Sequence, residues 1–489
     1  MSFKKYFRCR SIESLLTEAT KSHDLKRTFG AFQLILLGIG AIIGAGIFVL
    51  IGPAAGGHAG PAITLSFIIA GLACACAALS YAELSSSIPI AGSSYTYAYA
   101  ALGELSAWFI AGMVILTYGL GAATVASGWS GYFQSFIRDY GLIIPPEFSG
   151  SFGKEIIIDD VTHTAIFDLP ALVIVLALAA IVYYGAQASA TYNTIIVAIK
   201  MAVLFGFIAI GATKVDPVNW SPFIPENTGE FGKFGFSGII AGSSIIFLAY
   251  TGFDAVATAA QETKNPKRDL PIGIVGSLVI CMIVYILVSA VLTGIAPYPE
   301  LNVSDPVAVA VNKLNMPWLA TMIKIGAIAG LTSVILVMLY SVVRIFYTVT
   351  HDGLLPEWIG KTHKKYKTPH ILTIIIALII AFFSSVVPTG SLAKLANLGT
   401  LVTFTIVCIG TVYLRYKRPD MKREFHCPFV PWVPLAGALL FGGIIFGLPY
   451  TTLMQAGVWI AFWVLIYFVY GRHNSHLQHP HLKKQYIIK

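Results

Sequence analysis

The stretch Gly38-Ile-Gly-Ala-Ile-Ile-Gly-Ala-Gly-Ile-Phe48 lies in the middle of an apolar run that is long enough to cross a bilayer. Glycine in a helix interior costs about 1 kcal/mol relative to alanine, so this density of glycine predicts a helix that stops near Ile43 and resumes near Gly46. A second long apolar run is interrupted by Tyr250-Thr-Gly252. Unwound backbone is costly in hydrocarbon unless it lines a cavity or binds a ligand, so the two breaks are the candidate functional site.

The composition identifies the class of protein. The 489 residues are 56% hydrophobic and 11% charged, whereas soluble domains carry about 25% charged residues. The sequence therefore predicts a polytopic membrane protein that sits in the lipid bilayer. The net charge of +9 comes from basic residues that flank apolar runs, where they set the orientation in the membrane, so we expect no nucleic-acid partner.

Twelve apolar runs are long enough to span the membrane, which predicts an all-α polytopic membrane protein with 12 transmembrane helices. With both termini in the cytoplasm, 23 of the 32 Lys and Arg residues lie in cytoplasmic segments and five lie in outer loops. This bias predicts a cell-membrane protein with cytoplasmic N- and C-termini. The spans are placed near residues 29–51, 61–85, 95–128, 168–185, 189–213, 236–261, 270–296, 318–349, 370–388, 392–414, 431–449 and 454–471.

The spans divide into two similar sets. Spans 1 to 5 and spans 6 to 10 have nearly the same total length, and each set opens with a broken helix. Because five is odd, the second set must cross the membrane in the opposite sense, which makes an inverted repeat. The predicted organisation is an N-terminal arm (1–28), a first repeat (29–213), a second repeat (236–414), two further spans (431–471) and a C-terminal tail (472–489).

The backbone at the two breaks offers groups that suit a free amino acid. The first turn of a resumed helix has N–H groups without acceptors and the positive end of the helix dipole, which suit a carboxylate. The carbonyl groups that end the preceding half-helix suit an ammonium group. The alternative is helix packing, because Gly40-x-x-x-Gly44 is a small-x-x-x-small pattern. The predicted substrate-binding residues are Ile42, Ile43, Gly44, Ala45, Gly46, Phe247, Ala249, Tyr250, Thr251, Gly252 and, from span 8, Ser333.

Several motifs resemble one group of transporters. Gly-Ala-Ile-Ile-Gly-Ala-Gly-Ile-Phe-Val (40–49) and residues 80–97 are similar to the amino acid–polyamine–organocation (APC) superfamily. Within it, residues 250–254, 262–274 and 351–356 resemble the cationic amino acid transporter branch and its bacterial proton-coupled relatives. The resemblance implies a LeuT-like fold, with a 5+5 inverted repeat and two further C-terminal helices. It also implies amino acid transport by alternating access, with the substrate held between the breaks of spans 1 and 6.

Lys200 lies near the middle of span 5, too deep for its ammonium group to reach either membrane surface easily. An ionisable residue at this depth indicates a functional role, and burial disfavours its charged form, so Lys200 could exchange a coupling proton. The resemblance also implies this role, because in proton-coupled relatives a span 5 lysine takes the place of a sodium ion. The alternative is a permanently charged lysine that bridges span 5 to carbonyl groups at the span 1 break.

Other residues near the breaks are candidates for gating and specificity. Asp254 directly follows the second break and is expected to be a helix cap or a gate. Phe247 and Tyr250 are expected either to cover the substrate or to pack in the core. The candidates for recognising the substrate side chain are Thr117, Tyr118, Thr332 and Ser333.

Five charged residues lie near the ends of spans. Lys324, Lys394 and Arg344 are close enough to a membrane surface for snorkelling to explain them. Glu83 and Glu104 border spans at the predicted cytoplasmic face. We therefore expect these two carboxylates to belong to inner gating contacts.

The sequence predicts a secondary active amino acid permease that takes up its substrate by proton symport, with the cationic amino acids arginine and lysine as candidate substrates. No span presents a nucleophile with a base, and no cluster has metal-ligand spacing. We therefore expect no enzyme activity, no metal and no cofactor other than the coupling proton. Two alternatives remain: an amino acid or amine exchanger (antiporter), and a membrane amino acid sensor without turnover.

Overall fold

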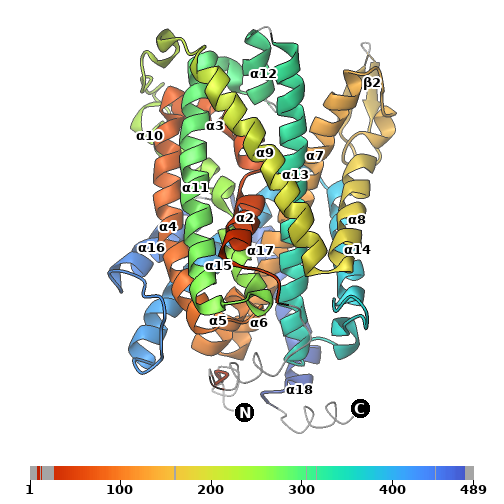
Figure 1. Ribbon diagram of the computed structural model, residues 1–489, viewed down its shortest axis with the longest axis vertical. Helices are drawn as coiled ribbons and strands as arrows, with labels where there is room; N and C mark the ends of the chain where they lie inside the picture. Colours follow the sequence, from red (N-terminus) through yellow and green to blue (C-terminus); the bar gives the residue numbers. More distant parts are fainter. Residues whose placement is uncertain are drawn as a thin grey trace.

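In the computed structural model the chain forms an elongated bundle of helices, most of which run along its longest axis (Figure 1). The structure describes residues 8–11, 13, 27–158, 161–303, 306–314, 316–446 and 448–478. Most of the predicted N-terminal arm (1–28) and the later part of the predicted tail (472–489) lie outside the described residues.

The elements follow one another with short connections. The α-helices are α2 (Ala31–Ile42), α3 (Ile51–Ala54), α4 (Ile63–Ser87), α5 (Ser94–Ala101), α6 (Glu104–Val114), α7 (Gly121–Arg138), α8 (Leu169–Tyr184), α9 (Ala186–Ala212), α10 (Gly235–Ile246), α11 (Pro266–Ile295), α12 (Pro306–Lys313), α13 (Pro317–His351), α14 (His370–Val386), α15 (Thr389–Lys417), α16 (Trp432–Phe446), α17 (Tyr450–Ile466) and α18 (Arg472–Asn474). The 3-10 and π-helical segments are η2 (Gly46–Leu50), η3 (Ala55–Ala59), η4 (Gly60–Ala62), η5 (Ile115–Leu120), η6 (Pro146–Phe148), η7 (Pro217–Trp220), η8 (Phe247–Tyr250), η9 (Phe253–Glu262), η10 (Tyr298–Leu301), η11 (Glu357–Gly360) and η12 (Tyr467–Gly471). The strands are β1 (Glu155–Ile158) and β2 (Val161–Thr164).

The bundle has two distinct ends. In Figure 1 the end that carries β2 and α12 is at the top, and the end that carries α5 and α18 is at the bottom. We call these the upper and lower ends. The strands pair as an antiparallel hairpin, with Glu155 opposite Thr164, and this hairpin lies outside the helices that the sequence predicts.

The helices have the length and composition of membrane spans. In the described part of the chain, eight helical runs are long and apolar enough to cross a membrane, and three further apolar helices are shorter. A crossing needs about 20 residues, so the first run of 57 residues, Ala31–Ser87, is long enough for two. The length and composition of these helices confirm the prediction of a polytopic helical membrane protein.

The predicted third span, near 95–128, is wrong at both ends. The structure divides this region into α5 and a separate run that begins at Glu104 and continues to Arg138. The division falls at Gly103, whose φ of 96° is in the left-handed region that glycine adopts without strain. The apolar pattern continues across this turn, and so it hides the boundary.

The first broken segment continues past its predicted end, and the second keeps its predicted ends within one residue but has a different helical geometry. After the first break the helical path continues to Ala59, eight residues beyond the predicted end, and turns at Gly60, which has a φ of 61°. After the second break the chain forms the 3-10 helix η9 and not a regular α-helix. Both broken segments therefore keep irregular geometry well past the break itself.

The first broken helix lies at the centre of the bundle. α2 packs against α11, α9 and α13, and Figure 1 shows it between α11 and α13. Leu34, Leu37, Ile39 and Ile42 of α2 are all buried. The break at the end of α2 is thus enclosed by other helices.

Candidate functional site at two helix breaks

The first break occurs where the glycine-rich stretch predicts it. α2 ends at Ile42, and Ile43 is extended, with φ −76° and ψ 102°. Helical structure resumes at Gly46 as η2. The Ile47 and Phe48 N–H groups both donate to the Gly44 oxygen at 3.3 Å, so the donors that the resumed segment can present at the break are the N–H groups before Ile47.

The second break occurs at Thr251 and Gly252. η8 ends at Tyr250, and Thr251 is extended, with ψ 132°. Gly252 has a φ of 128°, which only glycine adopts without strain. A Cβ on Gly252 would lie 2.8 Å from the Cβ of Ala41, so this glycine also lets the second break approach the end of α2.

The structure brings the two breaks into contact. A side chain on Gly46 would overlap Ala249, which precedes the second break. The hydroxyl of Tyr285, from α11, lies 2.7 Å from the carbonyl oxygen of Ile42 and 2.9 Å from that of Ala249. This phenol can donate to either carbonyl, and it therefore joins the ends of the two half-helices.

Glycine packing also explains part of the motif. A Cβ on Gly40 would overlap Asn193, and a Cβ on Gly44 would overlap Val334. The packing interpretation therefore holds for these two glycines, while Gly46 and Gly252 serve the contact between the breaks. Of the residues predicted to bind substrate, all except Ala45 are buried.

Lys200 lies at the first break, as both interpretations of this residue require. Its Nζ donates to the carbonyl oxygens of Ile39 at 2.9 Å, Gly40 at 3.2 Å and Ile43 at 2.8 Å. It also lies 2.8 Å from Ser333 Oγ, and the side chain is fully buried. Lys200 thus links α9 to the end of α2 and, through Ser333, to α13.

These contacts occupy some of the acceptor positions of the carbonyl groups at the first break. The Ile43 oxygen already accepts from Lys200, and the Ile42 oxygen shares the one Tyr285 hydroxyl hydrogen with the Ala249 oxygen. A carbonyl oxygen has two lone pairs, so each keeps one for a further donor. Ser333 Oγ lies 2.9 Å from the Gly40 oxygen, so this hydroxyl belongs to the same network.

The second break leaves two buried polar atoms without a partner. Thr251 Oγ1 and Asp254 Oδ1 have no hydrogen bond within the described part of the chain. The other carboxylate oxygen of Asp254 accepts from the Tyr118 hydroxyl at 2.5 Å. Buried polar groups are normally paired, so an unpartnered hydroxyl and carboxylate oxygen beside the break indicate a place for a ligand.

The other predicted specificity residues are engaged elsewhere. Thr117 donates to the Met113 carbonyl at 3.1 Å, and Thr332 accepts from the Trp129 indole N–H at 2.8 Å. Phe247 packs against Phe404 and Phe441. Tyr250 OH donates to the Phe67 carbonyl at 2.9 Å, so Phe247 and Tyr250 are core residues in this conformation.

The snorkelling prediction for Arg344 is wrong. Arg344 is buried and forms an ion pair with the buried Glu262 at 2.6 Å, and Tyr340 also donates to Glu262. A buried guanidinium group needs a charged partner, and the sequence interpretation missed Glu262 as that partner. Lys324 pairs with Asp139 at 2.6 Å.

Glu262 also ties the lower parts of the two broken segments together. The N–H groups of Thr28 and Phe29 donate to its carbonyl oxygen at 2.7 and 3.0 Å. The Lys264 N–H donates in turn to the Phe29 oxygen at 2.9 Å. The start of α2 and the end of η9 are therefore joined below the breaks.

Glu83 and Glu104 lie at the lower end and are both buried. Glu83 accepts from Arg415 at 2.7 and 2.8 Å and from Arg423 at 3.1 Å. Glu104 accepts from Tyr99 and Tyr467, both at 2.8 Å. These carboxylates connect α4 to α15 and α6 to η12, and their expected gating role stays a prediction.

Comparison with known proteins gives matches along most of the chain. The sequence profile of the amino acid permease family matches residues 29–471. The chain is 44% identical over 469 residues to the methylthioribose transporter of Bacillus subtilis (strain 168), covering 96% of this chain and 98% of the relative. It is 44% identical over 473 residues to the branched-chain amino acid permease BcaP of the same strain, with the same coverage. It is 35% identical over 402 residues to the vacuolar cationic amino acid transporter 4 of Arabidopsis thaliana, covering 81% of this chain and 65% of the relative.

Proposed function

This chain belongs to the amino acid permease family, and from that premise we propose that it carries amino acids across the cell membrane by alternating access, with the substrate bound between its two helix breaks. The family match confirms the superfamily that the sequence motifs indicate. It makes the chain a membrane-embedded transporter of small molecules. The location of the substrate is our own inference.

One observation carries this proposal: the two breaks touch and leave unused hydrogen-bonding groups at the contact. The N–H groups before Ile47 in η2 and before Ala255 in η9 can serve as donors for a carboxylate. The free lone pairs of Ile42 and Ile43, with the Thr251 hydroxyl, can accept from an ammonium group. A free amino acid carries both groups on one carbon.

We propose twelve crossings in a LeuT-like arrangement. The first of the eight long runs counts as two crossings, and the three shorter apolar helices bring the total to twelve. The two broken segments would then open the two halves of an inverted repeat. In this arrangement the lower end faces the cytoplasm, because most of the described basic residues flank it.

Alternating access requires that the path to one end opens while the other is closed. Contacts below the breaks close the lower path: Glu262 joins the start of α2 to η9 and pairs with Arg344 of α13. Opening toward the lower end would move α2 and η9 as one unit and separate them from α13. The breaks would serve as the hinges of that movement.

Proton coupling would act through Lys200. A lysine ammonium group has three N–H donors, and four acceptors lie within 3.2 Å of Nζ. Loss of a proton removes one donor and the charge, and so weakens the hold of α9 on the end of α2. Protonation of Lys200 and the position of α2 would therefore be linked.

Two substrate classes have separate support. A full-length relative at 44% identity is named a branched-chain amino acid permease, so leucine, isoleucine and valine are the first class. The cationic amino acids, lysine and arginine, are the second. The unpartnered carboxylate oxygen of Asp254 favours them, because it could accept from a cationic side chain.

The name of the methylthioribose transporter supports one further candidate substrate. Methylthioribose is an uncharged sugar derivative and would use only the hydroxyl and carbonyl groups at the breaks. It therefore belongs in any substrate panel for this protein.

Uptake by the purified protein in liposomes tests the proposal. The panel contains the twenty common amino acids and methylthioribose, each with and without an inward proton gradient and with and without internal substrate. We expect amino acid uptake that the proton gradient accelerates. Flux of no amino acid would overturn the permease proposal, and uptake that ignores the gradient would overturn proton coupling. A strict need for internal substrate would identify an exchanger instead.

A further inference from the structure

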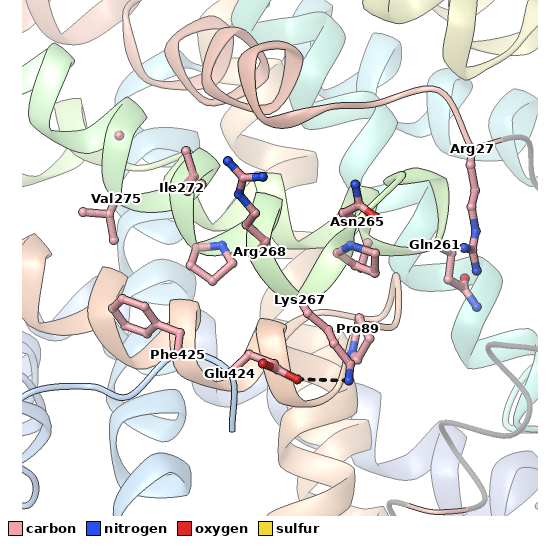
Figure 2. A pocket seen from close by; sticks show the side chains of 14 residues that line it. Arg27, Pro89, Gln261, Asn265, Lys267, Arg268, Ile272, Val275, Glu424 and Phe425 are labelled. Atoms are coloured by element: carbon pink, nitrogen blue, oxygen red, sulfur yellow. Dashed lines mark hydrogen bonds and ion pairs between the residues drawn. The ribbon is translucent and has the colours of Figure 1, made fainter. Parts of the chain in front are cut away.

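A large pocket lies at the lower end of the bundle, away from the helix breaks. It has a volume of about 1220 Å³ and lies between the segment before α2, the end of η9, the start of α11 and the loop before α16. Figure 2 shows Ile272, Val275 and Phe425 on one side of it and Arg27 with Gln261 on the other. None of the residues predicted to bind substrate lines this pocket.

The rim of the pocket is basic. Arg27, Lys267 and Arg268 line it together with one acidic residue, Glu424. Lys267 pairs with Glu424 at 3.2 Å, and both side chains are more than half exposed. Within the described part of the chain, Arg27 and Arg268 have no acidic partner closer than 4 Å. The rim therefore keeps an excess positive charge that can attract an anion.

The wall of the pocket is apolar and continues along the outside of α11. Ile272 lines the pocket and is 38% exposed. Val279, Ile283 and Leu287 are also exposed, at 46%, 51% and 42%. Spacings of seven, four and four residues place these side chains on one helix face. A basic rim thus meets an exposed apolar stripe on a helix that has the length and hydropathy of a membrane span.

We propose that this pocket binds an anionic phospholipid from the leaflet at the lower end of the bundle. The phosphate would lie between Arg27 and Arg268, and an acyl chain would lie along Ile272 and the exposed stripe of α11. Basic pockets beside membrane helices attract anionic headgroups in this way. Gln261 also lines the pocket, and its side-chain amide is a candidate partner for a headgroup hydroxyl such as those of phosphatidylglycerol.

The volume and the wall favour a lipid over free phosphate. The pocket far exceeds the size of a phosphate ion, and its wall includes Pro271, Ile272, Val275 and Phe425. A free anion would leave this apolar surface in contact with water, whereas an acyl chain covers it. The proposal does not depend on which substrate the protein transports.

Native mass spectrometry of the full-length protein in detergent tests the proposal. The probes are dioleoylphosphatidylglycerol, dioleoylphosphatidylcholine and inorganic phosphate. We expect phosphatidylglycerol to bind more tightly than phosphatidylcholine. The double variant Arg27→Gln/Arg268→Gln should bind phosphatidylglycerol about thirtyfold more weakly, since each basic group contributes about 1 kcal/mol near an anionic surface and about 1.4 kcal/mol is a factor of ten. The matched control is Lys361→Gln/Lys364→Gln, which removes the same charge from the exposed loop between α13 and α14 and should bind like the parent.

A third variant should bind phosphatidylglycerol more tightly than the parent, a result that misfolding could not produce. Glu424→Gln removes the acidic residue of the rim and should tighten phosphatidylglycerol binding about threefold. An equal loss in both double variants would overturn the proposal, as would equal binding of the two lipids. Displacement of phosphatidylglycerol by millimolar inorganic phosphate would show a phosphate site and would also overturn it.

Discussion

The Lys200 ammonium group has three N–H donors and four acceptors around it. The hydrogen bonding at the first break therefore depends on this one side chain. Three carbonyl oxygens at the end of α2 and the Ser333 hydroxyl lie around its ammonium group. A charge buried this deeply is stable only while these acceptors stay in place. We therefore propose that the protonation of Lys200 responds to a movement of the end of α2.

The variant Lys200→Met tests this role. Methionine fills a similar volume and donates no hydrogen bond, so Ile39, Gly40 and Ile43 lose a charged donor worth about 1.5–3 kcal/mol for each bond. We expect proton-driven uptake to fall to about a tenth of the parent or less. The control is Lys313→Met, because Lys313 pairs with Glu300, both side chains are more than a third exposed, and such pairs contribute about 0–1 kcal/mol. Uptake by Lys200→Met that keeps its response to the pH gradient would refute the coupling role.

Tyr285 offers a second test at the residue scale. Tyr285→Phe removes the hydroxyl that lies between the Ile42 and Ala249 oxygens and leaves one buried acceptor unpaired, at a cost of about 1–3 kcal/mol. We expect a lower melting temperature and slower uptake, both measured on the purified protein. Tyr413→Phe, at a position that is 41% exposed on α15, should change neither. Parent-like uptake by Tyr285→Phe would mean that the two breaks do not need this link.

Among the elements, α2 and η9 act as a joined pair. Their backbones are hydrogen-bonded at Phe29 and Glu262, and the Glu262 side chain attaches the pair to α13 through Arg344. The side chains of Arg344 and Glu262 are each only 2% exposed. A movement that opens the lower path must break the ion pair or carry α13 along with it.

Removing one partner of this buried ion pair has a predictable cost. Glu262→Gln leaves Arg344 buried without a countercharge, and we expect destabilisation of about 3–5 kcal/mol, seen as a large fall in melting temperature. The double variant Glu262→Gln/Arg344→Met should recover most of that loss. Glu424→Gln breaks the exposed pair with Lys267 and should cost less than about 1 kcal/mol. Equal melting temperatures for Glu262→Gln and Glu424→Gln would contradict this account of the lower path.

The sequence predicted those features of the helices that depend on residues close together in the chain. Glycine density located the first break, and the depth of Lys200 in its span indicated a role at that break. The Arg344–Glu262 pair was missed because its partners are 82 residues apart and neither residue alone reveals the other. The turn at Gly103 was missed because apolar residues continue across it. The contacts of Tyr118 and Tyr285 depend on how separate helices pack, which no local pattern encodes.

At the scale of the whole molecule, the positions of the charges predict an orientation. Most of the Lys and Arg residues that the structure describes flank the lower end, including those of the loop between α13 and α14 and the loop before α16. Such residues stay on the cytoplasmic side during insertion. The upper end, with the hairpin and α12, should therefore face outward.

Epitope tags measure this orientation directly. A tag inserted after Gly229, in an exposed loop at the upper end, should bind antibody in intact cells. A tag at the C-terminus should bind antibody only after the membrane is permeabilised. The reverse pattern would invert the predicted topology, and staining of both tags in intact cells would rule out the odd number of crossings predicted between Gly229 and the C-terminus.

The central claim is that a substrate occupies the contact between the two helix breaks, and Thr251→Val tests it most directly. Valine matches the shape of threonine and removes a buried hydroxyl that has no hydrogen-bond partner in the described part of the chain. The melting temperature should therefore stay the same or rise, while the affinity for the best-transported amino acid of the uptake panel falls about tenfold, measured by equilibrium binding to the purified protein. Thr411→Val, which removes a buried hydroxyl bonded within α15, should bind substrate like the parent. Unchanged affinity in Thr251→Val would contradict the claim that the substrate lies between the breaks.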